Sequence, residues 1–201
     1  MNEKIGSPIY LLRHGETEWN TQKRKQGHRN SPLTERGCTQ AAENGRRLKP
    51  RVSIDRPLAV ISSPLGRAMQ TASKVVEVLG LSPNIIECED RLMECSFGLW
   101  EGLAEAEIKR QFPHEWAARS LDRWNTSAPD GESYADVNAR VSAWYRELSR
   151  EETTIVVCHG LTSRVFRGIY LGLSEQEIFE LSEPQDGFFE LRDGVSIFVE
   201  G

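Results

Sequence analysis

Short runs of apolar residues alternate with longer segments of mixed polarity along most of the chain. A continuous apolar run of about four to eight residues is too short for a helix and predicts a buried strand. Such runs predict strands over Ile9–Leu12, Leu58–Ile61 and Thr154–Cys158, with a shorter strand around Ile85-Ile86. Two further runs flank Asp193-Gly194, a dipeptide typical of tight turns, and predict a C-terminal hairpin over residues 188–191 and 195–199.

The segments between these runs carry apolar residues at helical spacing. Helices are expected from Thr34 to Pro50, from Pro64 to Gly80, from Ser133 onward, and after His159-Gly160 to Leu171. Thr34 is the expected N-cap of the first, and Ser133 with Asp136 forms a capping-box pattern. The alternation predicts an α/β fold, a three-layer sandwich with a mostly parallel central sheet flanked by helices.

The segment from Leu103 to Trp124 departs from this alternation. It is charged and rich in aromatic residues, and it predicts two helical pieces divided by Pro113. We expect a single domain over residues 1–201, with residues of about 95–132 forming a small helical insertion that caps the functional site. Trp100, Trp116 and Trp124 are expected to cluster there, either as an apolar cap over a bound molecule or as the insertion's own small core.

The composition is that of a globular protein. Hydrophobic residues make up 38% and charged residues 27% of the 201 residues, which argues against wholesale disorder. The net charge of −5 excludes a generally basic nucleic-acid binder, and no apolar run approaches the ~20 residues of a membrane span. The N-terminus lacks the apolar segment of a secretory signal. We therefore expect a cytoplasmic protein without nucleic-acid or membrane partners.

The cysteines show no metal or redox pattern. None of the four has a partner at CxxC spacing, which argues against a zinc ribbon or a redox pair. We expect all four to be reduced thiols in the core, at Cys38, Cys88, Cys95 and Cys158.

Two of the predicted strands end in a histidine followed by glycine, at His14-Gly15 and His159-Gly160. Ligands of open α/β sheets bind beyond the carboxyl ends of the strands, and glycine lets the backbone approach a ligand closely. Taken alone, each histidine could equally satisfy a hydrogen bond in the core. Arg67, in the first turn of a helix directly after another strand, favours a ligand site over this structural role. With Arg13, these groups form a pocket suited to phosphate.

Five blocks of residues follow one another in order over most of the chain. They are Leu12–Asn20 with Gln26-Gly27, Pro32–Thr34 and Gly37; Ser62–Ala72; Glu94 to Gly102; Pro129–Ser133; and Val157–Gly160. In these blocks and their order the chain resembles the histidine phosphatase (phosphoglycerate mutase-like) superfamily. A lone Arg-His-Gly would be weak evidence, whereas the order of the blocks is specific. Asn30 departs from the commonest pattern, in which aspartate is frequent.

The resemblance implies a role for each matching residue. His14 would be the nucleophile that forms a phosphohistidine, and Arg13, Arg67 and His159 would hold the phosphoryl oxygens. The residues expected to bind substrate are Asn20, Gln26, Gly27 and Gly160. No metal and no cofactor are expected, because the cationic pocket would neutralise the phosphoryl charge.

Glu94 occupies the position at which this family places its general acid. It would protonate the leaving oxygen and then activate the water that hydrolyses the phosphohistidine. The other candidates are Glu16, Glu18 and Glu101, for which a structural role is expected instead.

The resemblance implies a metal-independent phosphomonoesterase for a small phosphorylated metabolite. A phosphoglycerate mutase is the alternative, followed by a non-catalytic phosphate-binding module. The short aromatic insertion favours the phosphatase, since the mutases carry a longer basic insertion. The basic stretch Lys23–Lys25 is either a positive rim for an anionic substrate or a solvated loop. Exposed aromatic residues and the hairpin edge would permit a homodimer.

Overall fold

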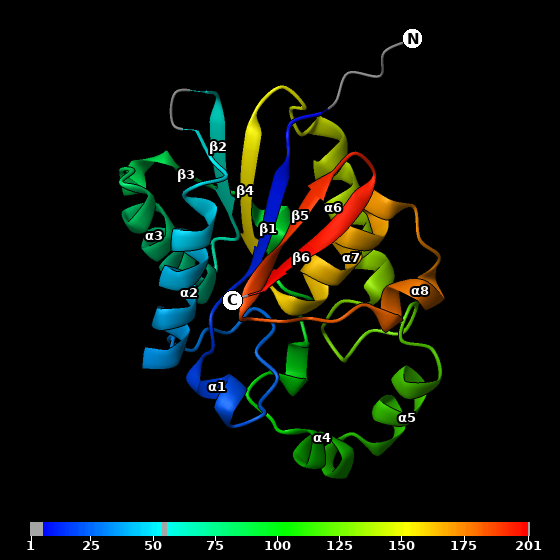
Figure 1. The fold of residues 1–201 in the computed structure, drawn as a ribbon. Coiled ribbons are helices and arrows are strands. Elements are labelled where there is room, and N and C mark those ends of the chain that lie inside the picture. Colours follow the sequence, from blue (N-terminus) through cyan, green and yellow to red (C-terminus); the bar gives the residue numbers. More distant parts are fainter. Residues whose placement is uncertain (1–5, 54–55, 201) are drawn as a thin grey trace.

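A six-stranded sheet lies at the centre of the fold (Figure 1). The computed structural model describes residues 6–53 and 56–200. From one edge of the sheet to the other, the strands are β3 (Ile86–Cys88), β2 (Leu58–Ser62), β4 (Thr153–Cys158), β1 (Ile9–Arg13), β5 (Gly187–Arg192) and β6 (Val195–Glu200). The first four pair in parallel, whereas β5 pairs antiparallel with both β1 and β6. The predicted α/β fold is confirmed.

Both faces of the sheet are buried. In β1, Ile9 and Leu11 belong to one core cluster, whereas Tyr10 and Leu12 belong to a second cluster on the opposite face. β4 divides its side chains between the two clusters in the same way, as the two-residue period of a strand requires. Burial on both faces explains why these strands read as continuous apolar runs.

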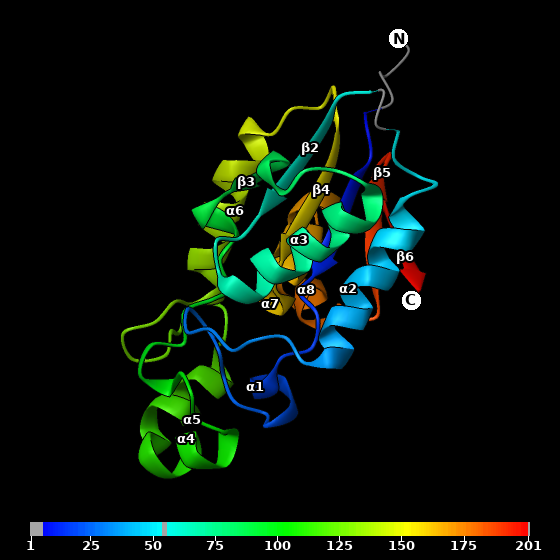
Figure 2. The same ribbon diagram turned by 90° about the vertical axis from the view of Figure 1, so that its left-hand side faces the viewer.

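Helices cover the two faces as separate layers. On one face lie α2 (Glu35–Leu48) and α3 (Gly66–Leu79), and on the other lie α6 (Tyr134–Glu147), α7 (Gly160–Leu171) and α8 (Glu175–Glu180). Figure 2 shows α2 and α3 together on their side of the sheet. None of the helices in residues 6–53 and 56–200 is long and apolar enough to span a membrane.

Several helix ends follow the sequence closely. Thr34 caps α2 by accepting the N–H of Gly37, and Ser133 and Asp136 form the predicted reciprocal capping box of α6. α3 begins at Gly66 rather than at Pro64, and Gly80 caps its C-terminus. Gly80 has a positive φ, and its N–H donates to the carbonyls of Val76 and Glu77.

Residues 95–132 lie beyond the carboxyl ends of the parallel strands (Figures 1 and 2). They contain α4 (Glu105–Gln111) and α5 (Pro113–Leu121), divided at Pro113 as predicted. Trp100 is fully buried in a small local core, with the ring centroid of Trp116 at 5.6 Å. The expected cluster of three tryptophans is wrong for Trp124. Its ring instead stacks on Tyr134 at 6.1 Å, against the main core.

Other differences concern short polar segments and two thiols. The sequence pattern did not predict α1 (Glu18–Thr21) or α8, because a helix of four to six residues carries too few apolar positions to show a period. Cys95 and Cys158 are buried as expected, but Cys38 and Cys88 are exposed. The expectation of four core cysteines is therefore wrong for these two.

Candidate active site

His14 and His159 meet at the carboxyl ends of two neighbouring strands. β1 and β4 are adjacent and parallel, and Arg13 is in register with Cys158. The histidine that follows each strand is consequently brought beside the other, with ring centroids 5.2 Å apart. Both side chains are almost entirely buried, at 2% and 0% exposure. The two histidines that the sequence places at strand ends therefore lie side by side at this edge of the sheet.

One nitrogen of the His14 ring is committed to the backbone. Nδ1 lies 2.8 Å from the carbonyl oxygen of Gly15, and since a carbonyl only accepts, Nδ1 must carry the proton. This tautomer leaves the lone pair on Nε2. Among the described residues, Nε2 has one hydrogen-bond partner, the Nε–H of Arg67, which donates to this lone pair at 3.3 Å. A nucleophilic nitrogen is thus held beside a cation.

Arg67 is a fully buried guanidinium at the centre of the site. Besides His14, it donates to the carbonyl oxygens of Arg29 and Gly27, each at 2.8 Å. Its own backbone N–H donates to Oδ1 of Asn30 at 2.9 Å. Asn30 therefore satisfies one of the backbone N–H groups in the first turn of α3, which have no partner within the helix. Burial lowers the pKa of Arg67 to about 10, which leaves the side chain charged at neutral pH.

Both histidines are held neutral. Burial, followed by the positive charge of Arg67, lowers the pKa of His14 well below its ordinary value. The same two causes, in the same order, lower the pKa of His159. Both imidazoles are therefore uncharged at neutral pH. Nε2 of His14 keeps the lone pair that a nucleophile needs, although it accepts a hydrogen bond from Arg67.

Ser63 orients the second histidine. Its hydroxyl lies 2.7 Å from Nε2 of His159 and accepts the N–H of Leu65. Nδ1 of His159 is buried and has no hydrogen-bond partner among the described residues. It is therefore the ring nitrogen left for a bound phosphoryl oxygen. The sequence pattern assigns no role to Ser63, although its position directly after β2 is a signal for one.

Arg13 is anchored from the far end of the chain. Its Nη1 donates to the carbonyl oxygen of Glu183, while its Nε is buried without a partner. A Cβ added at Gly160 would lie 2.6 Å from a carboxylate oxygen of Glu183 and 3.3 Å from Cζ of Arg13. The absence of a side chain at Gly160 thus lets Glu183 and Arg13 pack against the start of α7. None of these contacts assigns Gly160 to a ligand.

Glu94 lies against the start of α7. Its carboxylate accepts hydrogen bonds from the N–H groups of Leu161 and Thr162, both at 3.3 Å, and from the Thr162 hydroxyl at 3.2 Å. The N–H of Cys95 donates to it at 2.9 Å. Because α7 begins directly after His159, these hydrogen bonds hold the carboxylate against the backbone that follows this histidine.

The remaining predicted ligand residues have different surroundings. Oδ1 of Asn20 accepts from Thr17 and from Gln185, which leaves its amide nitrogen as the group available to a phosphate. Gln26 is buried, with its Oε1 unpartnered in the described part of the chain. Gly27 has φ of +52°, and its carbonyl oxygen holds Arg67.

The rival carboxylates have structural partners. Glu101 is 9% exposed and accepts the backbone N–H groups of His28 and Arg29 at 2.9 and 3.0 Å. It therefore holds the loop whose carbonyls hold Arg67. Glu16 accepts the hydroxyl of Thr34 at 2.9 Å, and Glu18 is exposed. The contacts of Glu101 and Glu16 are thus with the surrounding loops, as a structural role requires, whereas Glu18 points to solvent.

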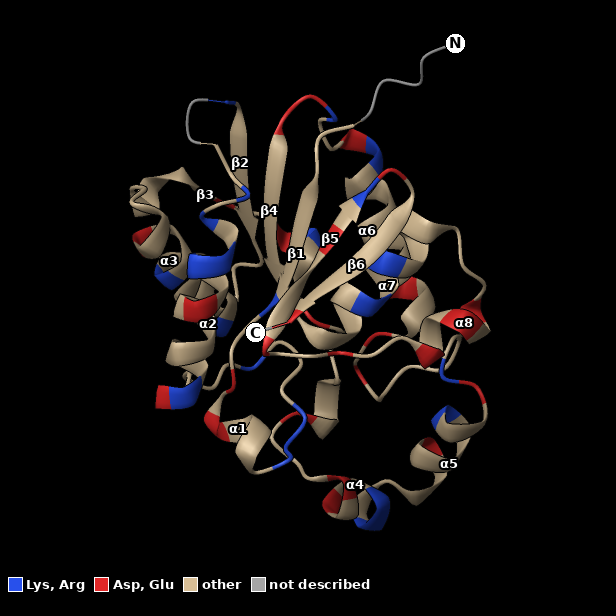
Figure 3. Ribbon diagram, in the orientation of Figure 1, with Lys and Arg blue, Asp and Glu red and all other residues tan. Residues whose placement is uncertain are grey.

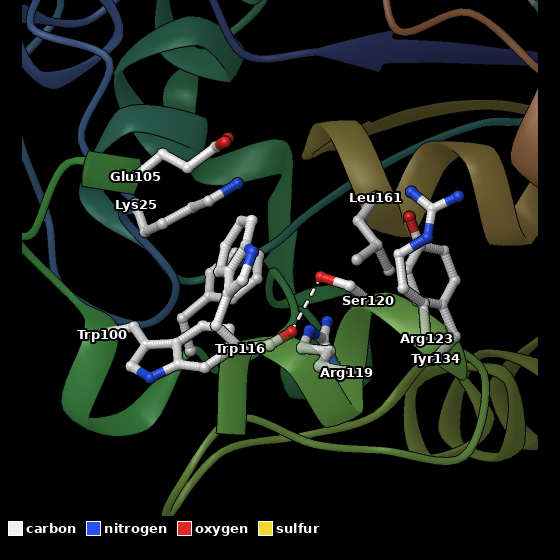
Figure 4. A pocket seen from close by; sticks show the side chains of 10 residues that line it. Lys25, Trp100, Glu105, Trp116, Arg119, Ser120, Arg123, Tyr134 and Leu161 are labelled. Carbon is white, nitrogen blue, oxygen red and sulfur yellow. Dashed lines mark hydrogen bonds between the residues drawn. The ribbon is translucent and has the colours of Figure 1, made fainter. Parts of the chain in front are cut away.

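A cavity of about 450 Å³ opens between the insertion and the start of α7 (Figure 4). Phe97 and Leu161 line it, and Lys25 lines it from the loop that holds Arg67. Of the basic stretch 23–25, Lys25 thus faces a cavity, whereas Arg24 donates to the carbonyl of Gly102 and to Glu107. In the described residues, no three His, Cys, Asp or Glu side chains are grouped to hold a metal ion.

The buried neutral histidines predict a pH-dependent stability. In the unfolded chain they titrate near pH 6.5, whereas their pKa values in the folded protein are well below this. The unfolded state therefore binds more protons below about pH 6.5. The free energy of unfolding should fall with decreasing pH by up to about 1.4 kcal/mol per pH unit for each histidine. Denaturant titrations in phosphate-free buffers between about pH 5 and 7.5 measure this slope.

The replacement His159→Asn isolates one of these histidines. The slope below about pH 6.5 should fall by roughly half in this variant, whatever its absolute stability. The exposed His114 supplies the control, and His114→Asn should retain the full slope. An unchanged slope in His159→Asn would contradict a neutral His159.

The chain belongs to the histidine phosphatase superfamily (branch 1), whose family model matches residues 9–187. The 2,3-bisphosphoglycerate-dependent phosphoglycerate mutase of Chelativorans sp. (strain BNC1) is 34% identical over 187 residues, 88% of this chain and 87% of the relative. Phosphoserine phosphatase 1 of Hydrogenobacter thermophilus is 32% identical over 168 residues, 82% and 76% of the two chains. The solved structure of mycobacterial glucosyl-3-phosphoglycerate phosphatase with VO3 has a TM-score of 0.78 at 30% identity, covering 92% of each chain. The relatives therefore include both mutases and phosphatases.

Proposed function

We propose that the chain is a metal-independent phosphomonoesterase that hydrolyses a small phosphorylated metabolite through a phosphohistidine at His14. The observation that carries the proposal is the state of this imidazole. Its Nδ1 proton is fixed on the Gly15 carbonyl, its Nε2 lone pair lies beside Arg67, and its pKa is lowered. The charges of Arg13 and Arg67 would supply the stabilisation that a metal ion gives in other phosphoryl-transfer enzymes.

The reaction has two displacement steps. Nε2 of His14 attacks the phosphorus, the bond from phosphorus to the ester oxygen breaks, and the leaving oxygen takes a proton from Glu94. Water then attacks the phosphohistidine, gives its proton to the Glu94 carboxylate, and restores the imidazole as phosphate forms. In both steps the guanidinium groups of Arg13 and Arg67, with Nδ1–H of His159, hold the phosphoryl oxygens on which charge develops.

Glu94 must give a proton in the first step and take one from water in the second. The N–H groups of Cys95, Leu161 and Thr162 hold its carboxyl group in place for both steps. The same carboxyl group serves both steps.

The replacement Glu94→Gln tests the role of this residue as the acid, because the loss of activity should depend on the leaving group. An ester with a poor leaving group needs the proton, whereas an activated aryl phosphate does not. We expect kcat/KM for an alkyl phosphate to fall about 10²–10⁴-fold, and that for 4-nitrophenyl phosphate to fall far less. The measurement is kcat/KM for the two esters with each enzyme, and equal losses on both would count against the role of Glu94 as the acid.

A phosphoglycerate mutase is the second candidate, because a mutase relative matches 88% of this chain at 34% identity. Mutase and phosphatase share the first step and differ in what removes the phosphoryl group from His14. Interconversion of 2- and 3-phosphoglycerate in the presence of the bisphosphate tests this candidate directly.

The experiment for the proposed function is hydrolysis of 4-nitrophenyl phosphate in excess chelator. Turnover undiminished by chelator, together with little mutase activity, is the expected result. Turnover that requires an added metal ion would overturn the proposal. Binding of inorganic phosphate with no turnover of any ester would indicate a phosphate-binding module instead.

A further inference from the structure

We infer that the leaving group of the substrate carries a ring and a second negative charge, and that it occupies the cavity lined by Phe97 and Leu161 (Figure 4). The inference rests on the proposed function and identifies the class of substrate. It follows from the position, the charge and the walls of this cavity.

The cavity lies where the leaving group of a bound phosphate ester would extend. Leu161 contributes a wall, and its backbone N–H donates to the Glu94 carboxylate at 3.3 Å. Phe97 lines the cavity three residues after Glu94, and Lys25 lines it two residues before Gly27, whose carbonyl holds Arg67. A group extending from the oxygen that Glu94 protonates would therefore enter this space.

The cavity concentrates positive charge. Lys25, Arg119 and Arg123 all line it, and none of them forms an ion pair with a carboxylate in residues 6–53 and 56–200. The one lining carboxylate, Glu105, is already paired with Lys109 at 2.7 Å. In a chain of net charge −5, three such cations around one cavity are an unbalanced local charge. Figure 3 shows the basic loop after α1 on the side that faces the insertion.

Arg119 shows most clearly that a counter-charge is missing. It is only 7% exposed, and its Nη1 donates to the carbonyl oxygens of Thr126 and Glu132. Carbonyl oxygens satisfy hydrogen bonds but leave the charge uncompensated, and a buried charge is costly without an opposite charge. A carboxylate or phosphate on the substrate would supply this opposite charge. A neutral group would displace the water around Arg119 and leave its charge uncompensated.

Aromatic side chains form the walls between the cations. Phe97 lies between two of them, with Nζ of Lys25 and Cζ of Arg119 at 5.2 and 5.7 Å from its ring centroid. Trp100, Trp116 and Tyr134 complete the apolar lining. Figure 4 shows Lys25 and Arg123 at opposite ends of the cavity, with Trp116 between them. Such walls accept the flat faces of a ring, and about 450 Å³ lies within the size range of small-ligand sites.

Two esters that differ only in charge test the inference. 4-Carboxyphenyl phosphate and 4-carbamoylphenyl phosphate have leaving groups of nearly the same shape, and only the first carries the second negative charge. We expect kcat/KM for the carboxylate ester to exceed that for the amide ester by about tenfold. In Arg123→Gln and in Lys25→Gln this ratio should fall toward one. The control Arg110→Gln, an exposed cation of α4 that does not line the cavity, should keep the wild-type ratio.

The outcomes separate this inference from the proposed function. Hydrolysis of both esters with equal kcat/KM would overturn the inference and leave the phosphatase intact. A ratio that survives both glutamine replacements would overturn it as well. Hydrolysis of neither ester would count against the proposed function, and calorimetric binding of the two esters to the wild-type chain would then decide. Tighter binding of the carboxylate ester supports the charged cavity, and equal or absent binding overturns it.

Discussion

Replacing His14 with alanine is expected to lower kcat/KM for every phosphomonoester by about 10⁴-fold or more. The imidazole supplies the only nitrogen lone pair beside the Arg67 guanidinium among the described residues. No neighbour can take over, because the Nε2 atom of His159 is already engaged with Ser63. Steady-state kinetics with 4-nitrophenyl phosphate measure the loss.

The control for this variant is His114→Ala. His114 is exposed at the start of α5, so its removal should leave kcat/KM within about twofold of wild type. A His14→Ala protein that is folded and still turns over at more than about a hundredth of the wild-type rate would place the nucleophile elsewhere.

Replacing Arg67 should cost nearly as much activity. Methionine keeps much of the volume but removes the charge beside His14 and the donors to Gly27 and Arg29. A loss of about 10³-fold in kcat is expected, because one guanidinium acts on both the phosphoryl oxygens and the loop around them. Arg67→Lys should recover only a small part of this, since an ammonium cannot reproduce three directed N–H groups.

Thermal unfolding measures the effect of Arg67→Met on the loop separately from its effect on catalysis. Arg67→Met should unfold at a lower temperature, because the carbonyls of Gly27 and Arg29 lose their donors and that of Gly27 is buried. Wild-type kcat in Arg67→Lys would contradict the account, since it would mean that charge without direction is sufficient.

Much of this fold could be predicted from the chain alone. The strands β1, β2 and β4 are buried on both faces, so their sequences are continuous apolar runs with clear ends. Thr34 and Ser133 mark their helix starts through local hydrogen bonds. His14 and His159 could be paired in advance because each directly follows a parallel strand of one sheet.

The rest depends on contacts between distant segments. Gln185 donates to the carbonyl of His14 and to Asn20, across 171 and 165 residues, and Glu183 anchors Arg13 from the same loop. This loop has no periodic pattern that reveals where it packs. The sequence predicts substrate binding at Gly27 but gives no sign that its carbonyl also accepts from Arg67. The exposed position of Cys38 likewise reflects packing that a helical period alone cannot fix.

The most direct test of the account is identification of the phosphorylated atom. Wild-type enzyme would be mixed with 4-nitrophenyl phosphate in excess chelator and quenched within a turnover. Peptides would then be read by mass spectrometry under conditions that preserve acid-labile phosphate, and the labelled imidazole by phosphorus NMR. The account predicts one phosphoryl group, on Nε2 of His14, because Nδ1 is committed to the Gly15 carbonyl. A label on another residue, or turnover with no labelled intermediate, would contradict it.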